Sequence, residues 1–398
     1  MSEHTYWEHL GLAAAMAVSA FVLLGLLLRL RERQKTKMHI WAMIAFFVVN
    51  IFDLLDTFIY SEVFHVSNAF FLWSDVLIPG FMVTLYFYVR ALTSSTPKLR
   101  KKDAIHLLPF GVSFLFLLPE LALPGDVRAG VVDGHLSEGY QSLIDLSDTV
   151  FWCGWIVMLI VYGGLSIRRL ILHKRNIRTV FSALEGKTLR WLDGLVATIL
   201  GLALIVVVDE VRLLMGYASI REGVGSLLFD VILPVAFGLF ALKADPPLPD
   251  WTGAVLADRA DLSPVDTPEE PAERYARSGL TPQDHERIAN RLERSMSSGQ
   301  LWRDHSLNLR RLASEVGVPP IHLSEVLNSK LGMSFYDYVN QCRIRDACDL
   351  LLQSNDTIIE ISETVGFNAK STFNTSFKKI TDLTPSQWRV QHRSKPES

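Results

Sequence analysis

Seven long apolar runs within the first 243 residues constrain the fold of this chain more than any other feature. A helix needs about 20 mostly apolar residues to cross the hydrocarbon core of a bilayer. The composition, 49% hydrophobic and 20% charged residues, disfavours the alternative of a soluble protein with seven buried core helices. We therefore expect an all-α protein that begins with a seven-helix transmembrane bundle, residues 1–243. Its helices are expected near 9–30, 38–60, 69–92, 104–120, 143–167, 190–215 and 223–243.

The charges of the loops between these runs indicate an orientation. Lys and Arg gather after the first, third and fifth runs, at 29–37, 98–102 and 168–187, whereas the other loops are neutral or acidic. An excess of Lys and Arg marks the cytoplasmic side of a membrane. The first run is followed by its positive charges, which is the reverse of a secretory signal. We expect a multi-pass protein of the bacterial inner (cytoplasmic) membrane, with its N-terminus outside and residues 244–398 in the cytoplasm.

A tether is expected between the membrane half and the rest of the chain. Residues 244–280 are rich in Pro and acidic side chains and poor in large aliphatic ones, which is typical of an extended or disordered linker. A connecting helix is expected over 281–299, beginning at the cap-like sequence Thr281-Pro282-Gln283-Asp284. The basic loop 168–190 is a candidate docking partner for the acidic tether or for anionic lipids.

The remaining residues, 300–398, repeat one pattern. SLNLRRLASEVGVPPIHLSEVLNSK reads as an amphipathic helix, a turn at Gly317 and a second helix, and TIIEISETVGFNAKSTFNTSFKKI repeats this order around Gly366. A small residue, Ala313 or Ser362, stands four positions before each glycine, so that the second helix can cross the first closely. A single helix over 335–352, with one apolar face, is expected to join the two units.

These segments resemble the AraC/XylS family of bacterial transcription regulators. The resemblance covers residues 300–393 and is carried by LRRLASEVGVPPIHLSEVLN, FYDYVNQCRI and ISETVGFNAKSTFNTSFKKITDLTPSQWR. The layout as a whole resembles membrane-tethered members of that family. The resemblance implies that two recognition helices enter successive major-groove segments of double-stranded DNA, and that an activator would contact RNA polymerase. Two departures are Glu325, where a basic or neutral residue is common, and Asp382, where Gly is common and whose presence is expected to alter the last turn.

DNA contacts are predicted on both recognition helices, with a solvated surface as the alternative for each residue. Lys and Asn pair well with guanine and adenine edges, and the predicted reading residues of the second unit are Lys370, Ser371, Asn374 and Thr375. Phosphate contacts are predicted for Lys378, Lys379 and Arg389. The residues expected to be exposed and polar in the first unit are His322, Ser324 and Glu325.

The membrane half carries many acidic residues, which are costly inside a bilayer. The functional interpretation is an outward-facing pocket that selects a cation: an organic amine, a metal ion or protons. The alternative is that the carboxylates cap helices and that the aromatic residues belong to the interfacial belt. The ligand residues predicted on the first interpretation are Asp53, Asp56, Asp75, Asp148, Trp152, Asp209 and Asp230.

Several activities are disfavoured. No HExxH, GxSxG or Walker motif occurs, the three cysteines have no metal-ligand spacing, and the last apolar run has no central Lys for retinal. We therefore expect no enzyme, no cofactor and no dedicated metal site. The sequence predicts a membrane-bound transcription regulator that transduces an extracytoplasmic or intramembrane signal, and it is compatible with a homodimer. The alternatives are a transporter-like protein with a fused regulatory domain and a regulator that is only anchored by its helices.

Overall fold

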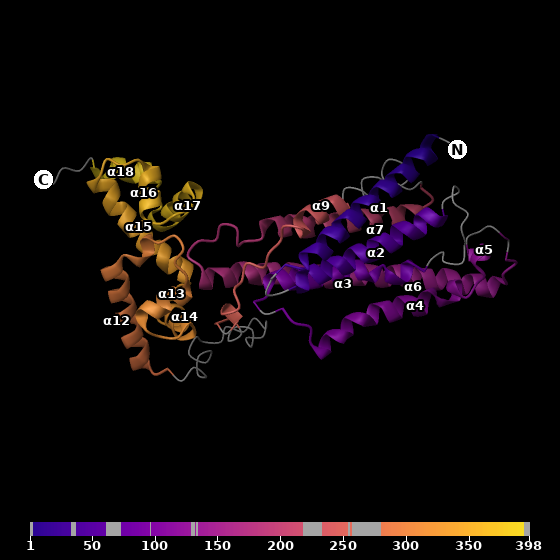
Figure 1. The fold of residues 1–398 in the computed structure, drawn as a ribbon, viewed down its shortest axis with the longest axis horizontal. Coiled ribbons are helices and arrows are strands. Elements are labelled where there is room, and N and C mark those ends of the chain that lie inside the picture. The colour runs from indigo at the N-terminus through magenta and orange to yellow at the C-terminus, as the bar shows by residue number, and fades with distance from the viewer. Residues whose placement is uncertain are drawn as a thin grey trace. The chain divides into compact units, whose positions relative to one another are not determined.

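The computed structural model describes residues 3–32, 37–60, 73–95, 97–128, 132, 134–217, 233–253, 255–256 and 280–393. These residues form helices and one isolated antiparallel bridge, between Phe181 and Asn308. The all-α class is therefore confirmed. The chain divides into two compact units, drawn in Figure 1. The unit with the predicted transmembrane helices, called the membrane unit for that prediction alone, comprises Met1–Ile171 and Leu189–Pro247, and the C-terminal unit comprises Leu172–Thr188 and Leu248–Ser398.

Six helical stretches of the membrane unit are long and apolar enough to cross a bilayer. They correspond to the first six predicted runs: Leu10–Arg29, Met38–Asp56, Asp75–Thr93, Lys101–Leu121, Glu138–Val180 and Arg190–Asp209. The seventh run falls mostly outside the described residues, and its end forms helix α9, Leu233–Ala241. The helices themselves are α1 (Glu3–Arg29), α2 (Met38–Tyr60), α3 (Pro79–Thr93), α4 (Leu108–Leu121), the short α5 (Gly125–Arg128), α6 (Glu138–Val180) and α7 (Arg190–Leu214).

The core of the membrane unit forms where α1, α2, α3, α6, α7 and α9 meet. Phe46 of α2 stacks on Phe237 of α9 with ring centroids 4.5 Å apart, and Ser19 donates a buried hydrogen bond to Asn50. Large apolar side chains also point away from this core: Phe21 is 72% exposed and Ile160 is 68% exposed. A helix bundle that is apolar both inside and outside is typical of a lipid-facing domain.

From residue 280 on, the described residues of the C-terminal unit form seven α-helices: α12 (Pro282–Gly299), α13 (Leu309–Val316), α14 (Pro320–Ser329), α15 (Phe335–Gln353), α16 (Ile358–Thr364), α17 (Lys370–Thr381) and α18 (Pro385–Arg393). The predicted connecting helix, both helix-turn-helix units and the linking helix all appear. Capping side chains explain several starts, because Thr281, Asn308, Ser334 and Thr357 each accept a hydrogen bond from the backbone N–H three residues ahead.

Helix α15 connects two apolar cores. Its first half, with Phe335 and Val339, packs with α12, α13 and α14, and its second half, with Ile344 and Leu351, packs with α16 and α17. The small residues that the sequence singles out, Ala313 and Ser362, are buried. Both turn glycines have a left-handed backbone, with φ of 70° at Gly317 and 93° at Gly366.

The compact units differ from the predicted domain boundaries in two segments. The end of α6 and the loop after it belong to the C-terminal unit, where Ile177, Val180 and Phe181 are buried in its first core. The beginning of the predicted tether also belongs there, because Leu248 and Val255 are buried in the same core. These apolar side chains explain the difference. The expected docking of the basic loop 168–190 concerns the acidic tether 245–273, of which residues 257–273 lie outside the described part of the chain.

Candidate nucleic-acid interface and acidic cluster

Helix α17 presents the predicted reading residues of the second unit. Lys370, Ser371 and Thr375 are exposed and Asn374 is partly exposed, all in the first half of the helix. The Thr375 hydroxyl donates a hydrogen bond to the Ser371 carbonyl, 2.9 Å away. Phe373 and Phe377 anchor the opposite face in the second core. The polar face of α17 is therefore held outward by its aromatic face.

The predicted phosphate-contacting residues lie further along the same unit. Lys378 and Lys379 are exposed in the last turn of α17, and Lys379 forms a 3.0 Å ion pair with Asp337 at the start of α15. Burial alone would raise the pKa of Asp337, but hydrogen bonds from Ser334 and Lys379 hold it below its usual value. Arg389 of α18 is partly buried and donates to the Asp356 carbonyl, 2.6 Å away.

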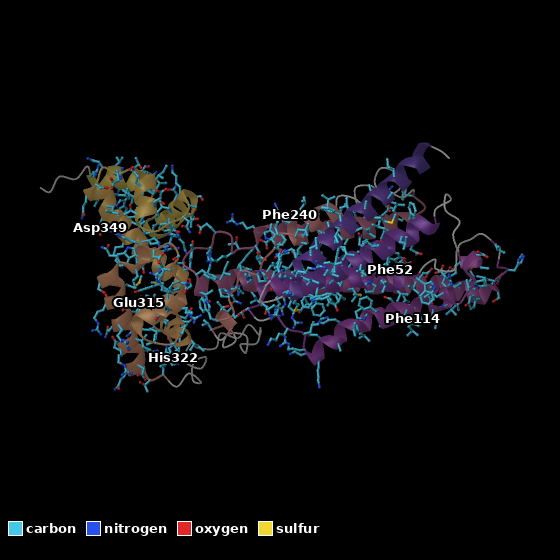
Figure 2. The ribbon with its side chains drawn as sticks, in the orientation of Figure 1. Phe52, Phe114, Phe240, Glu315, His322 and Asp349 are labelled. Carbon is cyan, nitrogen blue, oxygen red and sulfur yellow. The ribbon has the colours of Figure 1, made fainter. Side chains whose placement is uncertain are left out.

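The first unit differs from its prediction. His322 of α14, labelled in Figure 2, is partly exposed as expected. Ser324 and Glu325, however, are only 7% and 3% exposed, so the prediction that they are exposed is wrong. The reason is helix α12, which packs on α14 and places His285 Nε2 3.0 Å from Glu325 Oε1. The Ser329 hydroxyl also donates to the Glu325 carbonyl. Glu325 thus contributes to the packing of α12 on α14.

Arg343 of the linking helix is the largest fully buried side chain of the C-terminal unit that carries a charge. Its guanidinium donates to the carbonyls of Trp302 and Asp304, at 2.7 and 3.0 Å, and to the carbonyl of Ser182, at 3.1 Å. Its Cζ atom lies 5.4 Å from the centre of the Phe367 ring. Burial lowers the pKa of Arg343 to about 10, partly offset by the charge of Glu185. No sequence pattern points to Arg343, because its partners are backbone atoms distant in the sequence.

Asp346 of α15 also fixes residues 302–303, which precede the first helix-turn-helix unit. Asp346 accepts hydrogen bonds from the Trp302 indole, at 2.8 Å, and from two nitrogens of Arg303, at 2.7 and 2.9 Å. Burial alone would raise the pKa of Asp346, but these bonds and the charge of Arg303 keep it lowered. Residues 301–304 are therefore fixed to α15 from two directions.

The membrane unit brings several predicted ligand residues together. Asp53, Asp56 and Asp148 lie close enough to Asp75 to act on it electrostatically, and the Ser74 hydroxyl donates to Asp56 Oδ2, 2.8 Å away. We call this group, with Glu120, the acidic cluster. Glu120, which is hydrogen-bonded to Asp148, is not among the predicted ligand residues, because it ends the fourth apolar run and resembles an interfacial residue.

Three other ligand predictions have different surroundings. Trp152 packs in an apolar cluster with Phe151, and its ring centroid lies 6.0 Å from that of Trp155. Asp209 is fully buried in α7, and Asp230 lies outside the described residues. Among the residues that the structure describes, no group of three or more His, Cys, Asp or Glu side chains has the arrangement of a metal site.

Known proteins resemble the C-terminal unit. A family model described as a helix-turn-helix domain matches residues 312–391. The porin thermoregulatory protein EnvY of Escherichia coli K12 is 32% identical over 91 residues, which are 23% of this chain and 36% of EnvY. An uncharacterized HTH-type transcriptional regulator of Staphylococcus aureus strain COL is 35% identical over 83 residues, 21% of this chain and 11% of that protein. The chain thus spans well under two thirds of the length of these relatives.

One solved structure is also similar. The C-terminal domain of AraT, a response regulator from Geobacillus stearothermophilus, is 27% identical and covers 30% of this chain and 93% of its own, with a TM-score of 0.25.

Proposed function

Because the C-terminal unit carries a helix-turn-helix domain of the AraC type, which binds double-stranded DNA, we propose that the whole chain is a membrane-bound, sequence-specific transcription regulator. It would transduce an extracytoplasmic or intramembrane signal to nearby promoters. The observation that carries this proposal is the presence, on one chain, of six helices able to cross a membrane and of this domain. A homodimer and contact with RNA polymerase stay predictions.

The proposed orientation rests on the loop charges and on the location of DNA. Since positive loops stay in the cytoplasm, the C-terminal unit would share the compartment of the chromosome. The test is a genome-wide binding map of the full-length protein, combined with reporters of compartment fused after Ser398. Enriched promoter fragments and a cytoplasmic reporter signal would support the proposal. A reporter active only outside the cytoplasm would overturn it.

Replacing Lys378 with Ala should weaken DNA binding at all sequences. A lysine that contacts a phosphate releases a counterion, so the slope of log affinity against log salt should fall by about 0.9. The measurement is a salt titration of full-length protein in nanodiscs with a labelled duplex enriched from a random library. The matched control is Arg345→Ala, an exposed basic residue on α15, which should leave the slope unchanged. An unaltered slope for Lys378→Ala would remove this phosphate contact.

The acidic cluster supports a further part of the proposal, that the signal is a cation or protons. Asp75→Asn removes one ionisable carboxyl group from the cluster and should shift the midpoint of a promoter reporter's response to external pH or to an added divalent cation. A shift of about tenfold is expected, since a charge pair in contact at the protein surface is worth roughly 1–4 kcal/mol. The control is Asp126→Asn, an exposed acid of α5. Equal responses of the two variants and the wild type would contradict a cationic signal.

A further inference from the structure

The loop between α6 and α7, residues 181–188, begins inside the C-terminal unit, where Phe181, Ser182 and Ala183 are buried, and reaches its surface at Glu185. Phe181 forms the antiparallel bridge with Asn308, the residue that caps α13. The Ser182 hydroxyl donates to the Leu307 carbonyl, 2.5 Å away, and the Ser182 side chain is buried. The loop is therefore attached to the beginning of the first helix-turn-helix unit.

The same loop is attached to the linking helix. Arg343 donates to both the carbonyl and the hydroxyl of Ser182, at 3.1 and 3.3 Å. Just before the loop, two residues from the end of α6, the Cζ atom of Arg178 lies 5.7 Å from the ring centre of Tyr336 on α15. Helix α15 joins the two helix-turn-helix units and so determines the spacing between their recognition helices. The loop therefore contacts the helix that sets this spacing.

A third contact reaches the second recognition helix. The Thr372 hydroxyl, in the first turn of α17, donates to Glu185 Oε1 of the loop, 2.8 Å away. Thr372 directly follows the exposed reading residues Lys370 and Ser371. A carboxylate is thus held at the end of α17 where backbone N–H groups and the helix dipole favour an anion, as a DNA phosphate would be.

We propose that loop 181–188 couples the membrane unit to DNA binding, with Glu185 holding the place of a DNA phosphate at the first turn of α17. This inference rests on the proposed function. DNA and Glu185 compete, because both are anionic and both use the same turn. The loop directly continues α6, one helix from Glu138 to Val180, so a shift or rotation of that helix moves Glu185. The signal then passes through α6 and its loop and does not depend on the linker 244–280.

Polar residues of the first helix-turn-helix unit are also bonded to another part of the protein. Glu325 of α14 is bonded to His285 of α12, and Ser324 is buried beside it. Both recognition helices therefore have polar residues occupied by the protein itself.

The experiment compares full-length wild type and Glu185→Gln in nanodiscs, using the duplex that the wild type enriches from a random library. The variant keeps the size of the side chain and an acceptor for Thr372 but removes its charge. We expect about tenfold tighter binding at low salt, with the gain shrinking as salt rises, because like-charge repulsion at contact is screened. Hydrogen exchange should also show that DNA lowers the protection of the Ser182 amide.

The control is Asp349→Asn, which removes one exposed negative charge from α15 of the same unit. Its affinity should stay close to that of the wild type. Equal affinity of Glu185→Gln and the wild type, with unchanged exchange at Ser182, would overturn the coupling and leave DNA binding intact. Absence of binding to any duplex by wild type and variant alike would overturn the proposed function, and the coupling with it.

Discussion

Full-length protein carrying Gly366→Ala is expected to lose DNA binding and to unfold its C-terminal unit at a markedly lower denaturant concentration. Gly366 has φ of 93°, a conformation that costs L-residues about 1–3 kcal/mol. A Cβ atom there would lie 2.6 Å from the Arg303 carbonyl oxygen and 2.7 Å from that of Trp302. Both obstacles are backbone atoms, so relief requires moving residues 302–303.

That movement spreads to other contacts. The Trp302 carbonyl accepts a hydrogen bond from Arg343, and Arg303 is paired with Asp346, so displacing this segment disturbs both anchors on α15. We expect a total loss of about 3 kcal/mol or more, from backbone strain and overpacking together. Hydrogen exchange on peptides from 300–393, measured against denaturant in the full-length protein, gives the change in stability of this unit.

Gly332→Ala is the matched control. Gly332 also has a left-handed backbone, with φ of 64°, but no atom lies within 4 Å of the position a Cβ would take. This variant should therefore lose only about 1 kcal/mol, the cost of the backbone conformation. Equal stability losses for the two glycines would show that close approach to residues 302–303 has no role.

The helices of the C-terminal unit were predictable because their signals are local. Capping residues such as Asn308 and Thr357, the turn glycines and the apolar periodicity all lie within a few residues of the helix ends that they determine. Asp382 shows the limit of such signals. Its replacement of a common Gly is expected to alter the last turn, yet Asp382 adopts φ of 61° and its N–H bonds to the Lys378 carbonyl. Asp tolerates this conformation better than most residues.

What the sequence did not reveal depends on contacts between distant segments. Ser324 and Glu325 have polar side chains on a recognition helix, and only the packing of α12 shows that they are buried. Glu120 resembles the end of an apolar run until α6 brings Asp148 beside it. The loop 181–188 looks like the ordinary end of the basic segment 168–190, yet its bonds join it to Leu307, Arg343 and Thr372, which lie 125, 161 and 187 positions away along the chain. The periodic pattern of apolar residues along the sequence cannot predict contacts between residues so far apart.

The second large effect is expected for Arg343→Met. Methionine fills much of the same volume but donates no hydrogen bond, so the carbonyls of Trp302, Asp304 and Ser182 lose a buried donor. An unsatisfied buried polar group costs about 1–3 kcal/mol. Three carbonyl groups lose their donor, and water replaces it for some of them. We therefore expect the free energy of unfolding of the C-terminal unit to fall by about 3–5 kcal/mol.

Arg343→Lys separates charge from geometry. A lysine keeps the positive charge near Glu185, but its three N–H donors leave a single nitrogen, which cannot reach the three carbonyls that Nε, Nη1 and Nη2 of the guanidinium reach separately. It should therefore recover only a minor part of the loss.

Arg345→Met is the matched control on the same helix, because Arg345 is exposed. It should change stability by less than about 0.5 kcal/mol. Hydrogen exchange of full-length protein then decides whether Arg343 joins the loop to the linking helix. If it does, Arg343→Met frees the Ser182 amide together with residues 302–304, whereas Arg345→Met frees neither. Retained protection at Ser182 in Arg343→Met would mean that the bridge between Phe181 and Asn308 holds the loop alone, and that the linking helix receives no signal through it.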